Sequence, residues 1–147
     1  MSSDLRRRRA ALFTSLSAGL LIGTSLHAAE RMRPGQWEFS LTTDGASHTS
    51  THCVTDAAEV NGDVATARAA AEKKAAGHCT VKSFGIQGDT VSYTLVCGNR
   101  TLDSVTTFHG VTSEGTLTTT VQGAKPAVTH FKARRLGACP PGQVSNC

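Results

Sequence analysis

The sequence has few large side chains from which to build a hydrophobic core. It contains one tryptophan, one tyrosine and five phenylalanines among 147 residues. Beyond residue 28, leucine, isoleucine, valine and phenylalanine together number 21 of 119 residues, a share at which a chain of high net charge would be expected to stay disordered. The length fits a single domain, which excludes an enzyme with separate cofactor and substrate lobes.

Sequence motifs that would assign a chemistry are also missing. The chain has no glycine-rich phosphate loop and no strand-to-helix nucleophile elbow. It has no Cys-x-x-Cys pair for thiol redox chemistry, and its acidic residues are scattered singly, so no carboxylate pair for hydrolysis stands out. We therefore assign no catalytic residue and no cofactor, and we expect a protein that is not an enzyme.

The one long uncharged apolar run lies near the N-terminus. Four arginines at positions 6–9 precede residues 10–26, which are rich in Leu, Ala, Ser and Gly, and the small residues Ala28 and Ala29 follow. This order is typical of a secretory signal peptide, and no stop-transfer pattern follows it. We expect residues 1–28 to be removed, the protein to be exported to the periplasm or beyond it, and no transmembrane segment to remain.

Removal of this segment changes the charge of the chain. Residues 1–28 hold four arginines and one aspartate, so the remaining 119 residues carry 11 basic and 10 acidic side chains instead of 15 and 11. The formal net charge falls from +4 to +1. A basic cluster remains at Lys132, Arg134 and Arg135, but no aromatic residues are interleaved with it. We therefore expect no nucleic-acid partner and interpret the cluster as the solvated end of an edge strand.

Most of the remaining chain alternates between apolar and polar residues, as half-buried strands do. Threonine, which favours strands, occurs 18 times after residue 28 and suits a sheet with one face in water. We predict a mainly β fold, either an antiparallel meander or a partly closed β-barrel of six to seven strands. The predicted strands cover residues 37–42, 48–54, 81–84, 91–97, 101–108, 115–121 and 127–135.

An Ala-rich helical insert interrupts these strands. Asp56 and Glu59 have the spacing of a capping box, and residues 64–76 predict a helix that ends at Gly77 and lies on the domain surface. The predicted organisation is thus a signal peptide over residues 1–28, one β-rich domain over residues 29–139 and a C-terminal tail over residues 140–147.

Five cysteines follow the signal peptide: Cys53, Cys79, Cys97, Cys139 and Cys147. In an oxidising compartment these would form disulfides, which would stabilise a domain with a small core. Two bridges with one cysteine left over can form in 15 ways, and spacing does not choose among them. Our leading arrangement joins Cys53 to Cys79 and Cys97 to Cys139, with Cys147 as a free or intermolecular thiol. A C-terminal ring from Cys139 to Cys147 is the competing arrangement.

Two His-Cys dipeptides, at His52 and His78, are weak candidates for a metal site. Two histidines and two reduced cysteines would suit Zn or Cu. Adjacent residues on a strand point to opposite faces, however, and disulfide formation would remove the thiolates. We therefore predict no metal site and interpret both histidines as solvent-facing neighbours of a bridge.

Trp37 and Tyr93 are the only large amphipathic aromatics, and both fall on the apolar phase of their strands. They either pack in the core or line the mouth of a barrel that binds an apolar ligand. We expect a binding or envelope-interaction module whose partner is a small apolar ligand or an envelope protein. The alternative is a metal-binding protein or an enzyme that uses surface histidines.

Several short stretches, in this order, resemble one known family. They are Arg33-Pro34-Gly35-Gln36-Trp37-Glu38, Cys53-Val54-Thr55, Cys79-Thr80-Val81, the run from Gly88 to Cys97, and Arg134-Arg135-Leu136-Gly137-Ala138-Cys139. From Met32 to Cys139 the chain resembles the domain of unknown function 3617 family of small exported bacterial proteins. The resemblance implies a Gram-negative source and export, and it supplies no activity and no catalytic residues. The Ala-rich helix and the tail through Cys147 depart from the family pattern.

Overall fold

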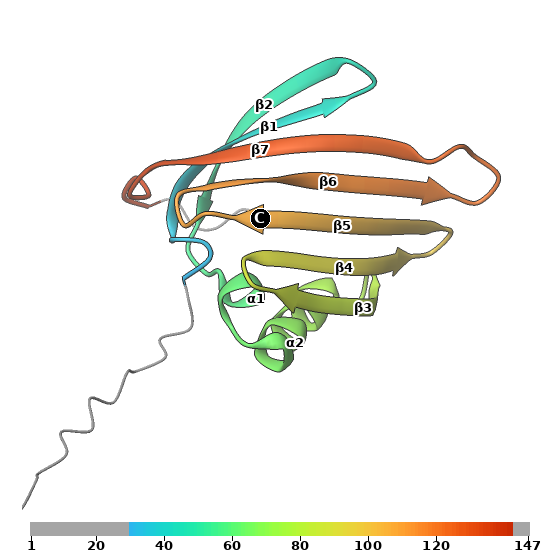
Figure 1. The fold of residues 1–147 in the computed structure, drawn as a ribbon, viewed down its shortest axis with the longest axis horizontal. Coiled ribbons are helices and arrows are strands. Elements are labelled where there is room, and N and C mark those ends of the chain that lie inside the picture. The colour runs from blue at the N-terminus through green and yellow to red at the C-terminus, as the bar shows by residue number, and fades with distance from the viewer. Residues whose placement is uncertain (1–29, 143–147) are drawn as a thin grey trace, which may run out of the picture.

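The protein folds into one antiparallel β-sheet with two short helices against one of its faces (Figure 1). The computed structural model describes residues 30–142. The order of strands across the sheet is β2-β1-β7-β6-β5-β4-β3, so β2 and β3 form its two edges and the sheet is not closed. The elements are β1 (Gly35–Thr43), β2 (Ala46–Val54), α1 (Ala58–Asn61), α2 (Val64–Ala75), β3 (Thr80–Gln87), β4 (Thr90–Cys97), β5 (Arg100–Phe108), β6 (Thr112–Val121) and β7 (Ala127–Gly137).

The predicted mainly β fold of six to seven antiparallel strands is confirmed, with seven strands in one open sheet. Strands β3 to β7 form a meander, but β1 pairs with β7 along Gln36 to Thr43. The helical connection therefore carries the chain from one edge of the sheet to the other. One prediction about this sheet was wrong. The cluster of Lys132, Arg134 and Arg135 does not mark an edge strand, because β7 is paired on both sides.

The two faces of the sheet differ in chemistry because side chains alternate along each strand. We call the side covered by the helices the inner face and the opposite side the outer face. The pairing register places Leu41, Phe131, Gly115, Thr106 and Val91 in one row on the inner face. The outer face carries most of the threonines and the exposed ion pair between Glu38 and Arg134. The sheet thus has one apolar face and one wet face.

The core lies between the inner face and the helical connection. Trp37 is fully buried, and the buried residues around it include Met32, Val91 and Phe108. Partly buried side chains from β1, β3 and β4 and from α1 pack against this cluster: Phe39, Val60, Phe84, Ile86 and Tyr93. With so few large residues, the space under the helices is only partly filled by side chains, and this unfilled space forms the candidate site.

The helical insert consists of two helices that are separated at Gly62 and Asp63. Asp56 lies one residue before the N-cap of the short α1, Ala57, and its Oδ1 accepts the backbone N–H of Ala58 (2.9 Å). The longer α2 begins at Asp63, whose Oδ1 accepts the backbone N–H of Thr66 (2.7 Å). The predicted capping box of Asp56 and Glu59 was wrong for the long helix. Glu59 forms an ion pair with Lys74, and the N-cap of α2 is Asp63, seven residues after Asp56. The predicted surface position of the helix agrees with its burial, since Ala67 is the one buried residue of α2.

Replacement of Asp63 by alanine is expected to destabilise α2 in a pH-dependent way. The hydrogen bonds from Thr66 hold the pKa of Asp63 below its ordinary value of 3.8. A lowered folded-state pKa means that the stabilisation is complete well above pH 4 and is lost as the pH falls through the folded pKa. Urea unfolding of wild type and Asp63→Ala between pH 7 and pH 3 should therefore show a difference that shrinks below about pH 4. The control Asp63→Asn keeps a cap without a titrating group, and an equal pH dependence in Asp63→Asn and wild type would contradict this account.

Two disulfides connect Cys53 to Cys139 and Cys79 to Cys97. Both the predicted arrangement and the competing ring from Cys139 to Cys147 were therefore wrong. The reason lies in the topology, because β2 and β3 are opposite edges of the sheet and keep Cys53 away from Cys79. Cys79 lies beside Cys97 because β3 pairs with β4, and Cys139 reaches β2 because only β1 separates β7 from β2. Cys147 lies outside the described residues.

Candidate functional site

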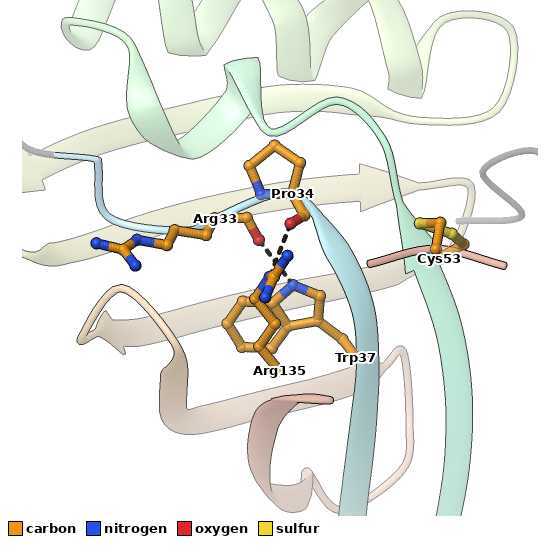
Figure 2. The surroundings of a disulfide bond; sticks show 6 residues. Arg33, Pro34, Trp37, Cys53 and Arg135 are labelled. Atoms are coloured by element: carbon orange, nitrogen blue, oxygen red, sulfur yellow. Dashed lines mark hydrogen bonds between the residues drawn. A yellow bond between two sulfur atoms is a disulfide. The ribbon is translucent and has the colours of Figure 1, made fainter. Parts of the chain in front are cut away.

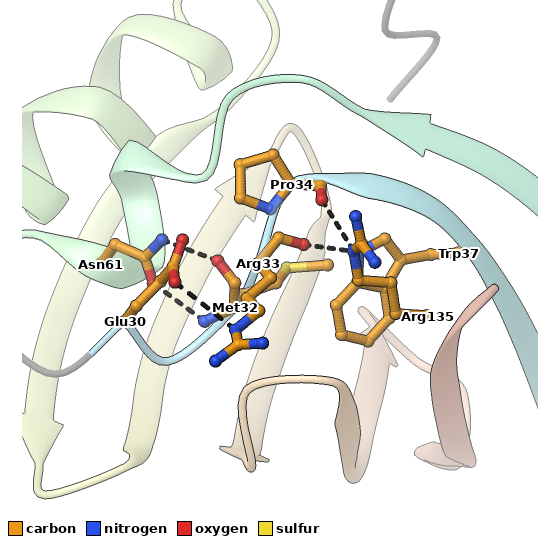
Figure 3. Close-up of polar contacts among 7 residues, drawn as sticks. All are labelled: Glu30, Met32, Arg33, Pro34, Trp37, Asn61 and Arg135. Carbon is orange, nitrogen blue, oxygen red and sulfur yellow. Dashed lines mark hydrogen bonds and ion pairs between the residues drawn. The ribbon is translucent and has the colours of Figure 1, made fainter. Parts of the chain in front are cut away.

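The segment over residues 30–34 closes one end of the space beneath the helices. Asn61 at the end of α1 brackets Met32: its Oδ1 accepts the backbone N–H of Met32 (2.9 Å), and its Nδ2 donates to the carbonyl of Met32 (2.7 Å; Figure 3). The Arg31 guanidinium donates to the carbonyls of Val60 (2.9 Å) and Gly62 (3.1 Å). These bonds satisfy carbonyl groups at the C-terminal end of the short α1. The segment and α1 are therefore held as one unit, with Met32 turned into the core.

The residues of the Arg-Pro-Gly-x-Trp-Glu motif attach this segment to β1 and β7. The Trp37 Nε1 donates to the carbonyl of Arg33 (2.9 Å), and the Arg135 Nε donates to the carbonyl of Pro34 (2.8 Å; Figures 2 and 3). Gly35 has a φ of +146°, and a Cβ at this position would collide with the carbonyl oxygen of Gly137 and lie 2.6 Å from the Arg135 Nε. Only glycine fits both the conformation and the space.

The role of this motif is therefore structural. Its interactions hold the entering chain to β1 through Trp37 and to β7 through Arg135, and Figure 2 shows them near the disulfide of Cys53, which joins β2 to the residues after β7. Glu38 extends the same contact on the outer face through its ion pair with Arg134 (2.8 Å). The motif and the disulfide together fix the first hairpin to the last strand.

A first cavity of about 260 Å³ lies between this junction and the helices. Side chains of β1, β4, β5 and β7 form its floor, including Phe39, Tyr93, Phe108 and Phe131. Gly115 on β6 lies opposite Phe131 in the pairing register, and a Cβ on Gly115 would come within 2.9 Å of that ring. The absence of a side chain at Gly115 thus lets the Phe131 ring lie over β6.

A second cavity of about 330 Å³ adjoins the first, under α2 and toward β3. It is lined by Ala71 and Ala75 of α2, Phe84 of β3 and Leu95 of β4, and the Phe84 and Tyr93 rings stack with their centroids 6.4 Å apart. Five residues line both cavities: Glu59, Val60, Lys74, Val91 and Tyr93. The two spaces therefore share part of their walls.

The charged side chains of both cavities, and one histidine, come from the connection between β2 and β3. They are Asp56, Glu59, Lys74 and His78, whereas the sheet contributes apolar groups and a few hydroxyls. The Lys74 Nζ lies 2.9 Å from the Glu59 Oε1, and this ion pair connects α1 to α2. The site thus has an apolar floor and a polar rim.

The structure places the two predicted lining aromatics differently. Trp37 is fully buried, with its indole N–H bonded to the carbonyl of Arg33, and it does not line either cavity. Tyr93 lines both cavities. The alternation of the sequence places both residues on the inner face. It does not indicate which inner-face residues are buried in the core and which line a cavity.

The two predicted weak metal candidates are separated by the fold. His52 lies on β2 and His78 precedes β3, at opposite edges of the sheet. His52 is half-buried, with its ring centroid 5.8 Å from that of Phe39 and its Nε2 3.0 Å from the Ser50 Oγ, so it is less solvent-facing than predicted. His78 is exposed at the second cavity. Within residues 30–142, no three His, Cys, Asp or Glu residues come together as a metal site would require.

Sequence reasoning missed most of the residues that form the cavities. Phe39, Phe108 and Phe131 lie on the apolar phase of predicted strands, so their side of the sheet could have been read from the alternation. Glu59 was assigned to a helix cap, and nothing in the sequence pairs it with Lys74, fifteen positions away.

No helix within residues 30–142 is long and apolar enough to cross a membrane.

These features define a class of protein: a single open sheet, fastened by disulfides, with an apolar cleft between one face and a helical connection. Residues 32–139 match the family model described as Protein of unknown function (DUF3617). The match covers well over half of the chain, and the protein belongs to this family. No curated protein and no solved structure matches the chain.

Proposed function

We propose that this protein is an exported, non-enzymatic binding protein that holds a small apolar ligand in the cleft between the inner face and the helices. The observation that carries the proposal is the pair of adjoining cavities of about 260 and 330 Å³ with apolar floors. Ligand sites are typically concave and mostly apolar, with a few polar groups at defined positions.

The construction of the fold supports this proposal. The inner face carries aromatic rings from three strands, Phe39, Tyr93 and Phe131, that are only half-buried by the protein itself. A ligand that covered them would gain about 25 cal/mol for each Å² of apolar surface removed from water. The surrounding framework is fixed by two disulfides and by the motif at Gly35, so the cleft is held open without a ligand.

Export is proposed from two independent features. Residues 1–28 have the order of a secretory signal peptide, and they lie outside the described residues. The two disulfides are typical of an oxidising compartment such as the periplasm. A periplasmic location would give the protein access to the apolar molecules of a bacterial envelope.

A fluorescent apolar probe, 1-anilinonaphthalene-8-sulfonate, tests the proposed site. We expect the wild-type protein to bind it, and Val60→Trp to weaken binding at least tenfold, because Val60 lines both cavities. The matched control is Val64→Trp, which places the same ring at a position that is 45% exposed and lines neither cavity. Native mass spectrometry of the protein isolated from cells should show a bound mass in wild type that is lost in Val60→Trp. Equal binding by the two variants would refute the proposed site, and a bound Zn or Cu would favour the metal-binding alternative.

A further inference from the structure

We propose that the two cavities form one elongated site, and that its ligand is a single-chain amphiphile whose apolar chain runs across the sheet beneath both helices. This inference rests on the proposed function and specifies the class of ligand. It depends on how the cavities adjoin, on the direction in which the cleft extends and on where its polar groups lie.

The first observation is the shared wall. Val60, Val91 and Tyr93 each line both cavities, Val60 from the helical side and the other two from β4. The first cavity, at about 260 Å³, is smaller than the roughly 300 to 1,000 Å³ typical of ligand sites, and the second is close to the lower bound. Taken together as one space, they fall inside that range. A single ligand that passes Tyr93 would use both.

The second observation is the shape of the combined space. Its lining begins at Phe39 on β1, continues past Phe131 on β7 and ends at Phe84 on β3. In the order of the sheet these strands are separated by five inter-strand steps. At about 4.8 Å a step this is a path of about 24 Å along the sheet. A compact ring system would fill one cavity only, whereas an extended chain would follow the whole path.

The third observation is the separation of polar from apolar groups. Asp56, Glu59, Lys74 and His78 all belong to the helical connection, and the floor beneath them is the apolar face of the sheet. A ligand in this cleft therefore meets apolar side chains along its length and charged or hydrogen-bonding groups at the rim. An apolar chain with one polar head has this distribution of chemistry.

The test is a chain-length series of saturated fatty acids from eight to sixteen carbons, measured by displacement of 1-anilinonaphthalene-8-sulfonate. In wild type we expect the affinity to rise roughly fourfold for each added methylene until both cavities are filled, and then to level off. Ala71→Phe narrows the second cavity alone. In that variant the affinity should level off at a shorter chain, while the eight-carbon acid binds within about twofold of wild type.

The matched control is Ala69→Phe, which adds the same ring to an exposed position of α2 that lines neither cavity. It should reproduce the wild-type series. Leu95→Phe, in the floor of the second cavity, is a second blocking variant in case Ala71→Phe does not fold. The same plateau length in wild type and in a folded blocking variant would overturn the single-chain site, as would affinities that do not depend on chain length. With either of these results the proposed apolar binding would stand. If wild type bound neither the probe nor any acid, the single-chain site and the proposed apolar binding would both fail.

Discussion

The double variant Cys53→Ser, Cys139→Ser is expected to have a free energy of unfolding about 4 to 5 kcal/mol below that of wild type. The bond closes a loop between residues 86 positions apart, and a cross-link of this span removes much conformational entropy from the unfolded chain. It also ties the edge strand β2 to the residues that follow β7. Because small domains are stable by only about 5 to 15 kcal/mol, this loss should leave the variant close to unfolding. Urea denaturation monitored by circular dichroism under non-reducing conditions measures it.

The other disulfide provides the comparison. Cys79 and Cys97 are only 18 positions apart, so the same entropy argument gives about 3 kcal/mol for Cys79→Ser, Cys97→Ser. The order of the two effects is the informative result, since both variants lose two sulfur atoms and one covalent bond. A larger loss from the shorter loop would show that loop closure does not govern the stability of this sheet.

Trp37→Ala is expected to lower the free energy of unfolding by about 3 to 5 kcal/mol, the range for removing a fully buried large aromatic. Trp37 has no exposed surface and is in the buried cluster with Val91 and Phe108. Its indole N–H also donates a hydrogen bond to the carbonyl of Arg33, in the segment that precedes β1. The loss should include detachment of the segment over residues 30–34, which is visible as faster amide hydrogen exchange at Met32.

Trp37→Phe separates these two contributions. Phenylalanine keeps a ring in the core but cannot donate to Arg33, so the expected loss is nearer to the roughly 1 to 3 kcal/mol of a lost part-buried hydrogen bond and a small cavity. If Trp37→Phe destabilised the protein as much as Trp37→Ala, the indole hydrogen bond would outweigh the packing, contrary to our account.

The local structure of this protein could be predicted from the sequence because it depends on local patterns. The alternation at residues 37–42 and 91–97 places Trp37, Phe39, Val91 and Tyr93 on one side of their strands, and the inner face contains all four. Most of the strand threonines lie on the outer face, away from the helices, where a β-branched polar residue suits both strand and water. The family was also evident from the motif at Arg33 and the order of the cysteines, and the match over residues 32–139 confirms it.

The long-range pairings could not be predicted in this way. Nothing in the alternation of β1 indicates that its second neighbour is β7, about a hundred residues later, and the disulfide pairing depends on this choice. The cavities were also beyond the sequence, because they depend on how far α1 and α2 stand from the sheet. The scarcity of large side chains predicts a small core, and the alternation identifies Tyr93 but also Trp37, which the packing encloses completely.

The pairing of β1 with β7 also determines when the fold can be completed. A chain that emerges from its N-terminus makes the β1–β2 hairpin and the helical connection first, yet the strand that β1 needs is the last one synthesised. Sheets that depend on such distant contacts fold slowly, and their apolar strands remain exposed to association in the meantime. Until β7 arrives, Phe39 and Trp37 lack the neighbour that covers them. The period between the first hairpin and the last strand is therefore when the apolar strands of this protein are most exposed to association.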